Sequence, residues 1–274
     1  MSADDRLVRG EYLVTGIAGC GNCHTPKGPD GEIEGMALAG GFAFPEESFT
    51  SYAANITPDK RTGIGGWTAD QIVTSIRDGV RPDGSLIGPP MPIEFYRGIS
   101  DSDAHAMAAY LMSVPAIENR VRTSQYDFPL PDSYGPPVVR VPDVLRDKPA
   151  AYGAYLAGPV GHCMECHTPW DEQNRLMLDT HAGAGGRDFH GPWGVSVSAD
   201  IRADTDLRVA GAWSDAEIVA AITTGTRPDG AQMPPPMGYG YYARMSDEDL
   251  AAIVAFLRTL SPVAGSPGAK TSSK

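Results

Sequence analysis

The chain has 274 residues, of which 42% are hydrophobic and 20% are charged, a balance typical of a folded globular protein rather than a disordered one. Its 22 basic residues against 34 acidic ones give a net charge of −12, which argues against nucleic acid or an anionic membrane surface as a partner. No apolar run approaches the ~20 residues of a membrane span, and the 32 glycines and 24 prolines predict a loop-rich chain.

Three helices are predicted in the first half of the chain. The first covers residues 4–17, and the second begins at the capping box Thr68–Gln71 and ends before Gly79. The third follows Ser100, a favourable N-cap with acidic residues in the next turn. The stretches between these helices are long and rich in glycine and proline, and strand signals are weak throughout.

The second half repeats this order. A helix over residues 150–157 is expected to end before Pro159, because proline disrupts a helix interior. The next begins at the capping box Ser214–Glu217 and ends before Gly225, and the last follows Ser246.

The two halves also align as sequences, which indicates a tandem duplication. Residues 81–100 match residues 227–246 without a gap, and Trp67 matches Trp213 at the same spacing. We therefore predict one domain over residues 1–120 and a second over 149–262, followed by a flexible tail over 263–274. The proline-rich segment 121–148 is expected to connect the domains and to pack along both, since its aromatic residues would otherwise be exposed.

The four cysteines fall into two identical motifs, Cys20-Gly-Asn-Cys23-His24 and Cys163-Met-Glu-Cys166-His167. A zinc ribbon needs closer cysteine pairs, a thioredoxin-like site needs a βαβ setting, and structural disulfides need no histidine. Cys-x-x-Cys-His is the motif of covalent c-type haem attachment, in which two thioethers hold the porphyrin and the histidine ligates the iron. The duplicated motif predicts two covalently bound haem c groups.

The surrounding residues resemble class I cytochrome c, present twice, and more closely the diheme cytochromes that serve periplasmic dehydrogenases. The matching motifs are Gly-x-Tyr-Leu before each haem motif, Cys-x-x-Cys-His-Thr-Pro, and Pro-Pro-Met ahead of a Ser-Asp helix. The resemblance implies an all-α fold of two tandem domains, each with a few helices and long loops around one haem. The second half departs at Asp200, where the first half has Asn55.

The resemblance also implies an iron ligand set. His24 and His167 are the expected proximal ligands, and the sixth ligand in such domains is a methionine from the loop before the final helix. Met91 occupies that place in the first half, and Met237 is its aligned counterpart. Met233 is the rival in the second half, but it aligns with Ile87, so Met237 is preferred. His181 or His190 is a less favoured replacement.

Four further residues are candidates for contact with the haem propionates. Trp67 and Trp213 carry indole N–H donors, and Arg81 and Arg227 carry a compensating charge. Both arginines lie in an Arg-Pro-Asp-Gly sequence, so a role as surface turn residues is equally well supported.

Two His/Met irons would leave no open position for a substrate, so we predict an electron-transfer protein rather than an enzyme. It would carry single electrons from a periplasmic dehydrogenase to a downstream cytochrome or terminal oxidase. The alternative is a diheme enzyme such as a peroxidase or a thiosulfate-oxidising cytochrome. Covalent haem attachment takes place outside the bacterial cytoplasm, so we expect a periplasmic protein, with peripheral membrane association allowed. Since the chain starts without a signal peptide, we expect that one was removed.

Overall fold

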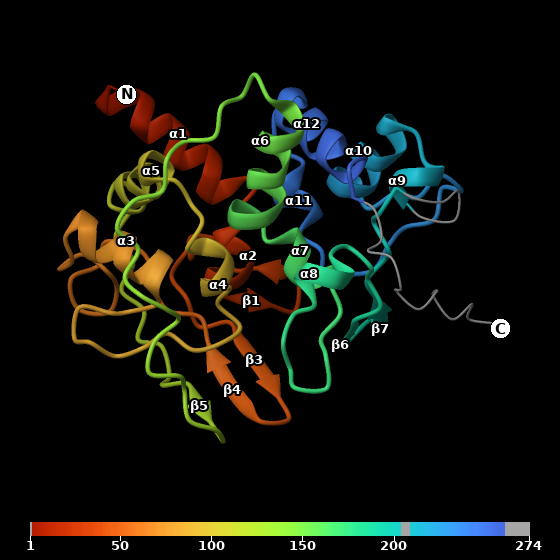
Figure 1. Cartoon of the computed structure of the whole chain (residues 1–274). Helices are drawn as coiled ribbons and strands as arrows, with labels where there is room; N and C mark the ends of the chain where they lie inside the picture. Colours follow the sequence, from red (N-terminus) through yellow and green to blue (C-terminus); the bar gives the residue numbers. More distant parts are fainter. Residues whose placement is uncertain (1, 204–208, 261–274) are drawn as a thin grey trace. The chain divides into compact units, whose positions relative to one another are not determined.

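A computed structural model describes residues 2–203 and 209–260, so the predicted tail over 263–274 lies outside the described residues. The chain divides into two compact units (Figure 1). Among the described residues, unit 1 holds those up to Val144 together with Pro159–His162 and Gly240–Met245, and unit 2 holds Leu145–Gly158, those between Cys163 and Tyr239, and those from Ser246 to residue 260. The sequence repeat does not predict that two short stretches of the second half group with unit 1.

The first part of the chain is built on five helices joined by long loops. These are α1 (Ala3–Thr15), α2 (Cys20–His24), α3 (Ala69–Asp78), α4 (Ile93–Tyr96) and α5 (Asp101–Leu111). Thr68 and Gln71 form the predicted capping box of α3, Gly79 ends that helix in the left-handed conformation, and Ser100 caps α5. The prediction of these helix starts and stops is confirmed.

The later elements follow the same order. They are α6 (Pro149–Tyr155), a π-helical turn (Leu156–Val160), α7 (Cys163–Cys166), α8 (Leu178–His181), α9 (Val209–Ala212), α10 (Asp215–Thr224), α11 (Tyr239–Tyr242) and α12 (Asp247–Leu257). Ser214 caps α10 and Ser246 caps α12 as predicted. The expectation that Pro159 lies beyond the helical segment is wrong, because the wider π turn includes this proline.

Each unit is centred on one helix crossing, which is visible for α1 and α5 in Figure 1. α1 crosses α5 in unit 1, and α6 crosses α12 in unit 2. Gly10 and Gly153 lie at these crossings, where an added Cβ would overlap the carbonyl oxygens of Ala106 and Ala252. The glycine of the Gly-x-Tyr-Leu motif is therefore required by close backbone approach, and the neighbouring Leu13 and Leu156 are fully buried.

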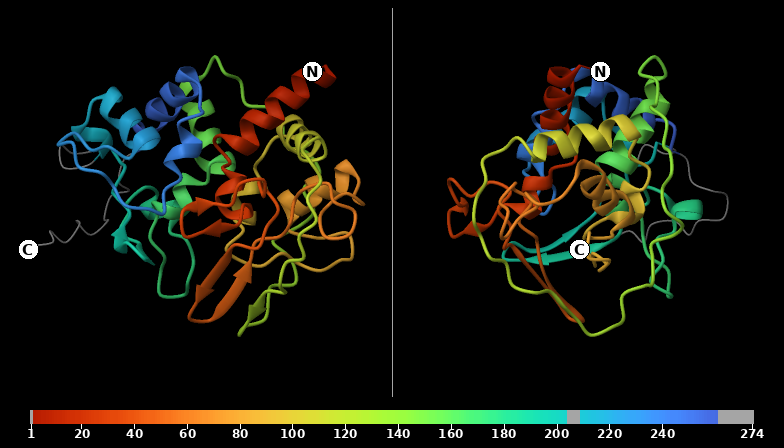
Figure 2. Two further views of the ribbon diagram at one scale, coloured as in Figure 1. Left: turned by 180° about the vertical axis from the view of Figure 1, so that it is seen from behind. Right: turned by 90° about the vertical axis from the view of Figure 1, so that its left-hand side faces the viewer.

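Short antiparallel strands, which the sequence signals only weakly, lie in the long loops (Figure 2). β3 (Ala43–Glu46) pairs with β4 (Phe49–Tyr52), which pairs with β5 (Gln125–Tyr126); β6 (Asp188–Gly191) pairs with β7 (Gly194–Val197), and β1 (Lys27–Gly28) with β2 (Gly31–Glu32). Most of their residues are exposed or half-buried, so no clear alternation of buried and exposed residues marks them in the sequence.

The proline-rich segment contributes to unit 1 up to Val144. Tyr126 stacks on Phe49 with ring centroids 5.6 Å apart and its hydroxyl donates to the carbonyl of Pro89 at 3.0 Å. Tyr134 donates to the carbonyl of Ile87 at 2.7 Å. Both hydrogen bonds end in the loop before Met91, so this segment supports the loop that carries the predicted sixth ligand.

Candidate functional site

The two Cys-x-x-Cys-His motifs lie on short helices of the same kind. α2 contains Cys20, Cys23 and His24, and α7 contains Cys163 and Cys166 with His167 directly after it. All four cysteines lie within the described residues and none forms a disulfide. Burial raises the pKa of Cys20 to about 12, with Cys23 adding to it, and burial raises the pKa of Cys163 to about 11. Burial thus disfavours the thiolate form that a redox-active pair uses.

The two histidines are held in the same way. Nδ1 of His24 donates to the carbonyl oxygen of Ala54 at 2.7 Å, and Nδ1 of His167 donates to that of Ala199 at 2.8 Å. A carbonyl only accepts, so Nδ1 carries the proton and Nε2 is the nitrogen that can bind a metal. Burial lowers the pKa of both imidazoles, although these hydrogen bonds oppose the effect, which favours the neutral ligand form. This arrangement fits an iron-binding imidazole with an outer-shell partner.

The loop that follows each histidine is also duplicated. The carbonyl of His24 accepts from the backbone N–H of Gly40, and that of His167 from Gly185, both at 2.7 Å. The next residue is a buried threonine in each half, and its hydroxyl accepts from a backbone N–H of the same loop, as Thr168 does from Gly183 at 3.2 Å. The threonine of the Cys-x-x-Cys-His-Thr-Pro motif therefore shapes the loop around the histidine.

The methionine loops share their backbone pattern as well. Met91 and Met237 are both half-buried, and each carbonyl accepts from the N–H two residues later, at 2.9 and 3.0 Å. At the start of each loop the N–H of Ile87 or Met233 donates to the carbonyl of the glycine that ends the preceding helix, at 2.7 and 2.8 Å. Met233 therefore has the backbone role of Ile87, and Met237 has that of Met91.

The remaining predicted residues occupy unequal environments. Trp67 and Trp213 are half-buried just before α3 and α10. Arg81 is half-buried and its Nη1 donates to the carbonyl of Leu86 at 2.6 Å, whereas Arg227 is exposed. Of the alternative histidines, His190 is exposed on β6.

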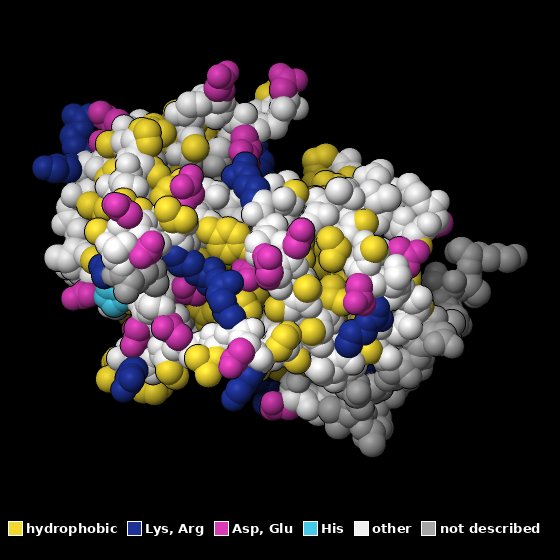
Figure 3. All heavy atoms as spheres, turned by 90° about the horizontal axis from the view of Figure 1, so that it is seen from above, with side chains coloured by type: hydrophobic (Ala, Val, Ile, Leu, Met, Phe, Trp, Pro, Cys, Tyr) yellow, Lys and Arg dark blue, Asp and Glu magenta, His cyan; other side chains and the backbone are white. Residues whose placement is uncertain are grey.

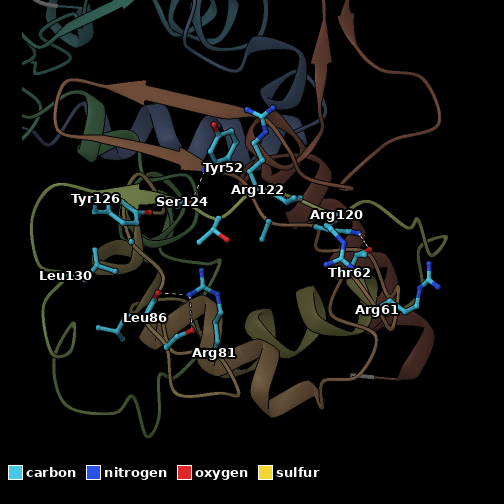
Figure 4. A pocket seen from close by; sticks show the side chains of 16 residues that line it. Tyr52, Arg61, Thr62, Arg81, Leu86, Arg120, Arg122, Ser124, Tyr126 and Leu130 are labelled. Atoms are coloured by element: carbon cyan, nitrogen blue, oxygen red, sulfur yellow. Dashed lines mark hydrogen bonds between the residues drawn. The ribbon is translucent and has the colours of Figure 1, made fainter.

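A cavity of about 550 Å³ in unit 1 lies beside the loop that holds His24. Ala54 and Asn55 line it, and Figure 4 shows the side chains of Arg81, Arg120 and Arg122 around the same space. The last two arginines come from the segment after α5, and the sequence repeat gives no signal for them. The cavity thus combines positive charge with the loop next to the histidine, a setting suited to carboxylate groups.

A second cavity, of about 380 Å³, lies at the matching loop of unit 2. Its lining includes Pro169, two residues after His167, together with His181, Asp200 and Arg202. Asp200 and Arg202 form an ion pair at 2.7 Å and the arginine side chain is only 3% exposed. Asp200, which replaces the asparagine of the first half, is therefore paired with a buried arginine that the repeat does not predict.

No group of three or more His, Cys, Asp or Glu side chains that could hold a metal ion occurs in the described ranges. The same part of the chain contains no helix long and apolar enough to cross a membrane. The chemistry of the donor set thus fits a haem, whose thioethers and imidazole these motifs supply.

Comparison with known proteins gives a consistent result. Residues 150–261 match the cytochrome c family model. The chain is 30% identical over 269 residues to the fructose dehydrogenase cytochrome subunit of Gluconobacter japonicus, covering 93% of this chain and 52% of that protein. It is 30% identical to the cytochrome c subunit of a quinone alcohol dehydrogenase of Gluconobacter oxydans, covering 95% of this chain and 56% of the other.

A shorter relative matches along most of its own length. The chain is 27% identical to a diheme cytochrome c-type protein of Cereibacter sphaeroides, over 93% of this chain and 86% of that protein. By contrast, the chain spans only about half the length of the two dehydrogenase subunits.

These relatives are named as cytochromes or cytochrome subunits, which agrees with the prediction of an electron-transfer protein rather than a catalytic enzyme. A cytochrome c domain implies covalently attached haem c, and the helical fold class predicted from the sequence is confirmed. Residues 150–261 therefore form a cytochrome c family domain, and nearly the whole chain is similar to dehydrogenase cytochrome subunits and to a diheme cytochrome c-type protein.

Proposed function

We propose that the chain is a diheme electron carrier. One haem c is attached to Cys20 and Cys23 and a second to Cys163 and Cys166. His24 and Met91 ligate the first iron, and His167 and Met237 ligate the second. The observation that carries this proposal is the pair of histidines that follow the cysteine motifs, each with Nδ1 held by an alanine carbonyl at 2.7 or 2.8 Å.

When bound, haem c supplies a one-electron ferric–ferrous couple. The protein fixes the tautomer of each histidine and would supply a thioether from each methionine loop. A thioether is a soft ligand that favours ferrous iron, so it raises the reduction potential. With a histidine and a methionine as ligands, each iron would have no position open for a substrate, so the proposed sites would transfer electrons only.

The electron donor that we propose is a dehydrogenase, and the acceptor is a further cytochrome or a terminal oxidase, with the protein in the periplasm. The support is that several similar proteins are named as dehydrogenase cytochrome subunits. The net charge of −12 favours association with a basic surface. Figure 3 shows acidic side chains spread among basic ones over one face.

The test is reduction of the ferric holoprotein by a dehydrogenase. Catalytic subunits of fructose, alcohol and gluconate dehydrogenases, each with its substrate, are mixed anaerobically with the holoprotein while its absorption is followed. We expect at least one to reduce both haems, at a rate that falls with added salt because the attraction is electrostatic. Turnover of hydrogen peroxide by the reduced protein, without reduction by any dehydrogenase, would instead identify a peroxidase.

A further inference from the structure

In each unit a turn follows the alanine whose carbonyl accepts a hydrogen bond from the histidine. Different side-chain hydrogen bonds close this turn in the two units. In unit 1, Oδ1 of Asn55 accepts from the backbone N–H of Thr57 at 2.9 Å and from its hydroxyl at 2.7 Å. In unit 2 the matching residues are Asp200 and Arg202. Nε and Nη2 of Arg202 donate to the two carboxylate oxygens at 2.9 and 2.7 Å. A neutral pair in unit 1 is thus replaced by an ion pair in unit 2.

One nitrogen of the Arg202 guanidinium takes no part in the ion pair. Nη1 of Arg202 is buried and has no hydrogen-bond partner within the described ranges 2–203 and 209–260. The side chain is 3% exposed and lines the cavity of about 380 Å³. A buried guanidinium N–H without an acceptor is unfavourable, and the side chain that carries it lines this cavity, which points to an acceptor bound there.

Position and charge identify that acceptor. The cavity also contacts Pro169 and Gly185, and Gly185 is bonded to the carbonyl of His167, so the cavity lies next to the proposed iron ligand. Arginine has donors and no acceptor, and its preferred partner is a carboxylate. The carboxylates that a haem brings to such a site are its propionates.

We propose that Nη1 of Arg202 binds a propionate of the haem on Cys163 and Cys166, which joins this propionate to Asp200 through one guanidinium group. This inference rests on the proposed function, because it requires the second haem. The arginine that the sequence repeat selects in this unit is Arg227, but its side chain is exposed. Unit 1 has Thr57 at the matching position, and its cavity obtains arginines from elsewhere, namely Arg81, Arg120 and Arg122 (Figure 4).

The test is the pH dependence of the reduction potential of the second haem, measured by redox titration of the holoprotein. The ionisable groups that line the cavity are His181, Asp200 and Arg202, and Arg187 acts on the neighbouring His167. All proteins carry His181→Gln, so that the lining of the cavity holds no imidazole. The decisive comparison is between Asp200→Asn and Asp200→Asn with Arg202→Gln, which differ only in the arginine. The double variant makes the pair neutral, as it is in unit 1.

We expect a flat potential between pH 5 and 8 while Arg202 is present, because the paired propionate stays ionised. Without Arg202 the propionate takes up a proton when the iron takes up an electron. The potential of that haem then falls as pH rises, by up to a tenfold change in the reduction equilibrium per pH unit, which is 59 mV for a one-electron couple.

An unchanged flat profile in the double variant, with two haems still attached, would overturn the proposal. So would a pH dependence that appears with Arg227→Gln and not with Arg202→Gln, since the turn arginine would then hold the propionate. Arg175→Gln, which alters an exposed arginine of the same unit, is the control and is expected to leave the profile flat. Counting haems in each variant separates failure of this inference from failure of the proposed function.

Discussion

Replacing Gly153 by alanine is expected to lower the free energy of unfolding of unit 2 by about 1–3 kcal/mol, the usual cost of overpacking. The new Cβ would overlap the carbonyl oxygen of Ala252, so α6 and α12 would have to separate. A backbone atom cannot be avoided by a side-chain rotation. The measurement is chemical denaturation of the holoprotein, followed by circular dichroism, and the expected result is a lower midpoint.

Gly158 provides a matched control in the same helical segment. A Cβ on Gly158 would meet no atom within 4 Å, and its backbone is not in the left-handed region. Gly158→Ala is therefore expected to leave the midpoint unchanged or to raise it slightly, because alanine restricts the unfolded chain. Equal midpoints for the two variants would show that the crossing is not as close as the structure has it.

Replacing Met237 by alanine is expected to remove the sixth ligand of the second iron. That haem should change from low spin to high spin in its absorption spectrum, and its potential should fall because the soft thioether no longer favours ferrous iron. The fall should exceed 59 mV, a tenfold change in the reduction equilibrium, since axial ligands tune haem potentials over ~0.8 V. The first haem should be unaffected.

Met233→Ala is the control for this assignment, because Met233 lies in the same loop and is also half-buried. Its backbone N–H bonds to Gly225 as that of Ile87 bonds to Gly79, so its replacement should leave both haems low-spin. The opposite outcome, with Met233→Ala giving the high-spin haem, would reassign the ligand. Met91→Ala should reproduce the effect of Met237→Ala at the first haem.

Local signals in the sequence are enough to predict the longer helices, but not the four-residue helices α4, α8, α9 and α11. Capping residues such as Thr68 and Ser214 and the stop at Gly79 act within one helical turn, so they can be read without knowledge of the tertiary structure. The strand pairs are not predictable in the same way, because strands such as β3 and β7 are mostly exposed and show no alternation of buried and exposed residues. Pro159 was misjudged because a π turn relieves the clash that proline causes in an α-helix.

In the candidate site, too, some residues are predictable from the sequence and others only from the fold. The cysteines and histidines follow from a contiguous motif, and the structure adds the hydrogen bonds to Ala54 and Ala199 that fix the histidine tautomers. Arg202 could not be found by repeat alignment, because its counterpart is Thr57. Only the fold brings its buried side chain to a cavity beside the loop of His167.

The central claim is that each Cys-x-x-Cys-His motif carries a haem, and the mass of the intact holoprotein under denaturing conditions tests it most directly. We expect the mass of the chain plus two haems. When Cys163 and Cys166 are both replaced by alanine, we expect the mass of the chain plus one haem. A native chain that carries a single haem, or haem that dissociates on denaturation, would contradict it.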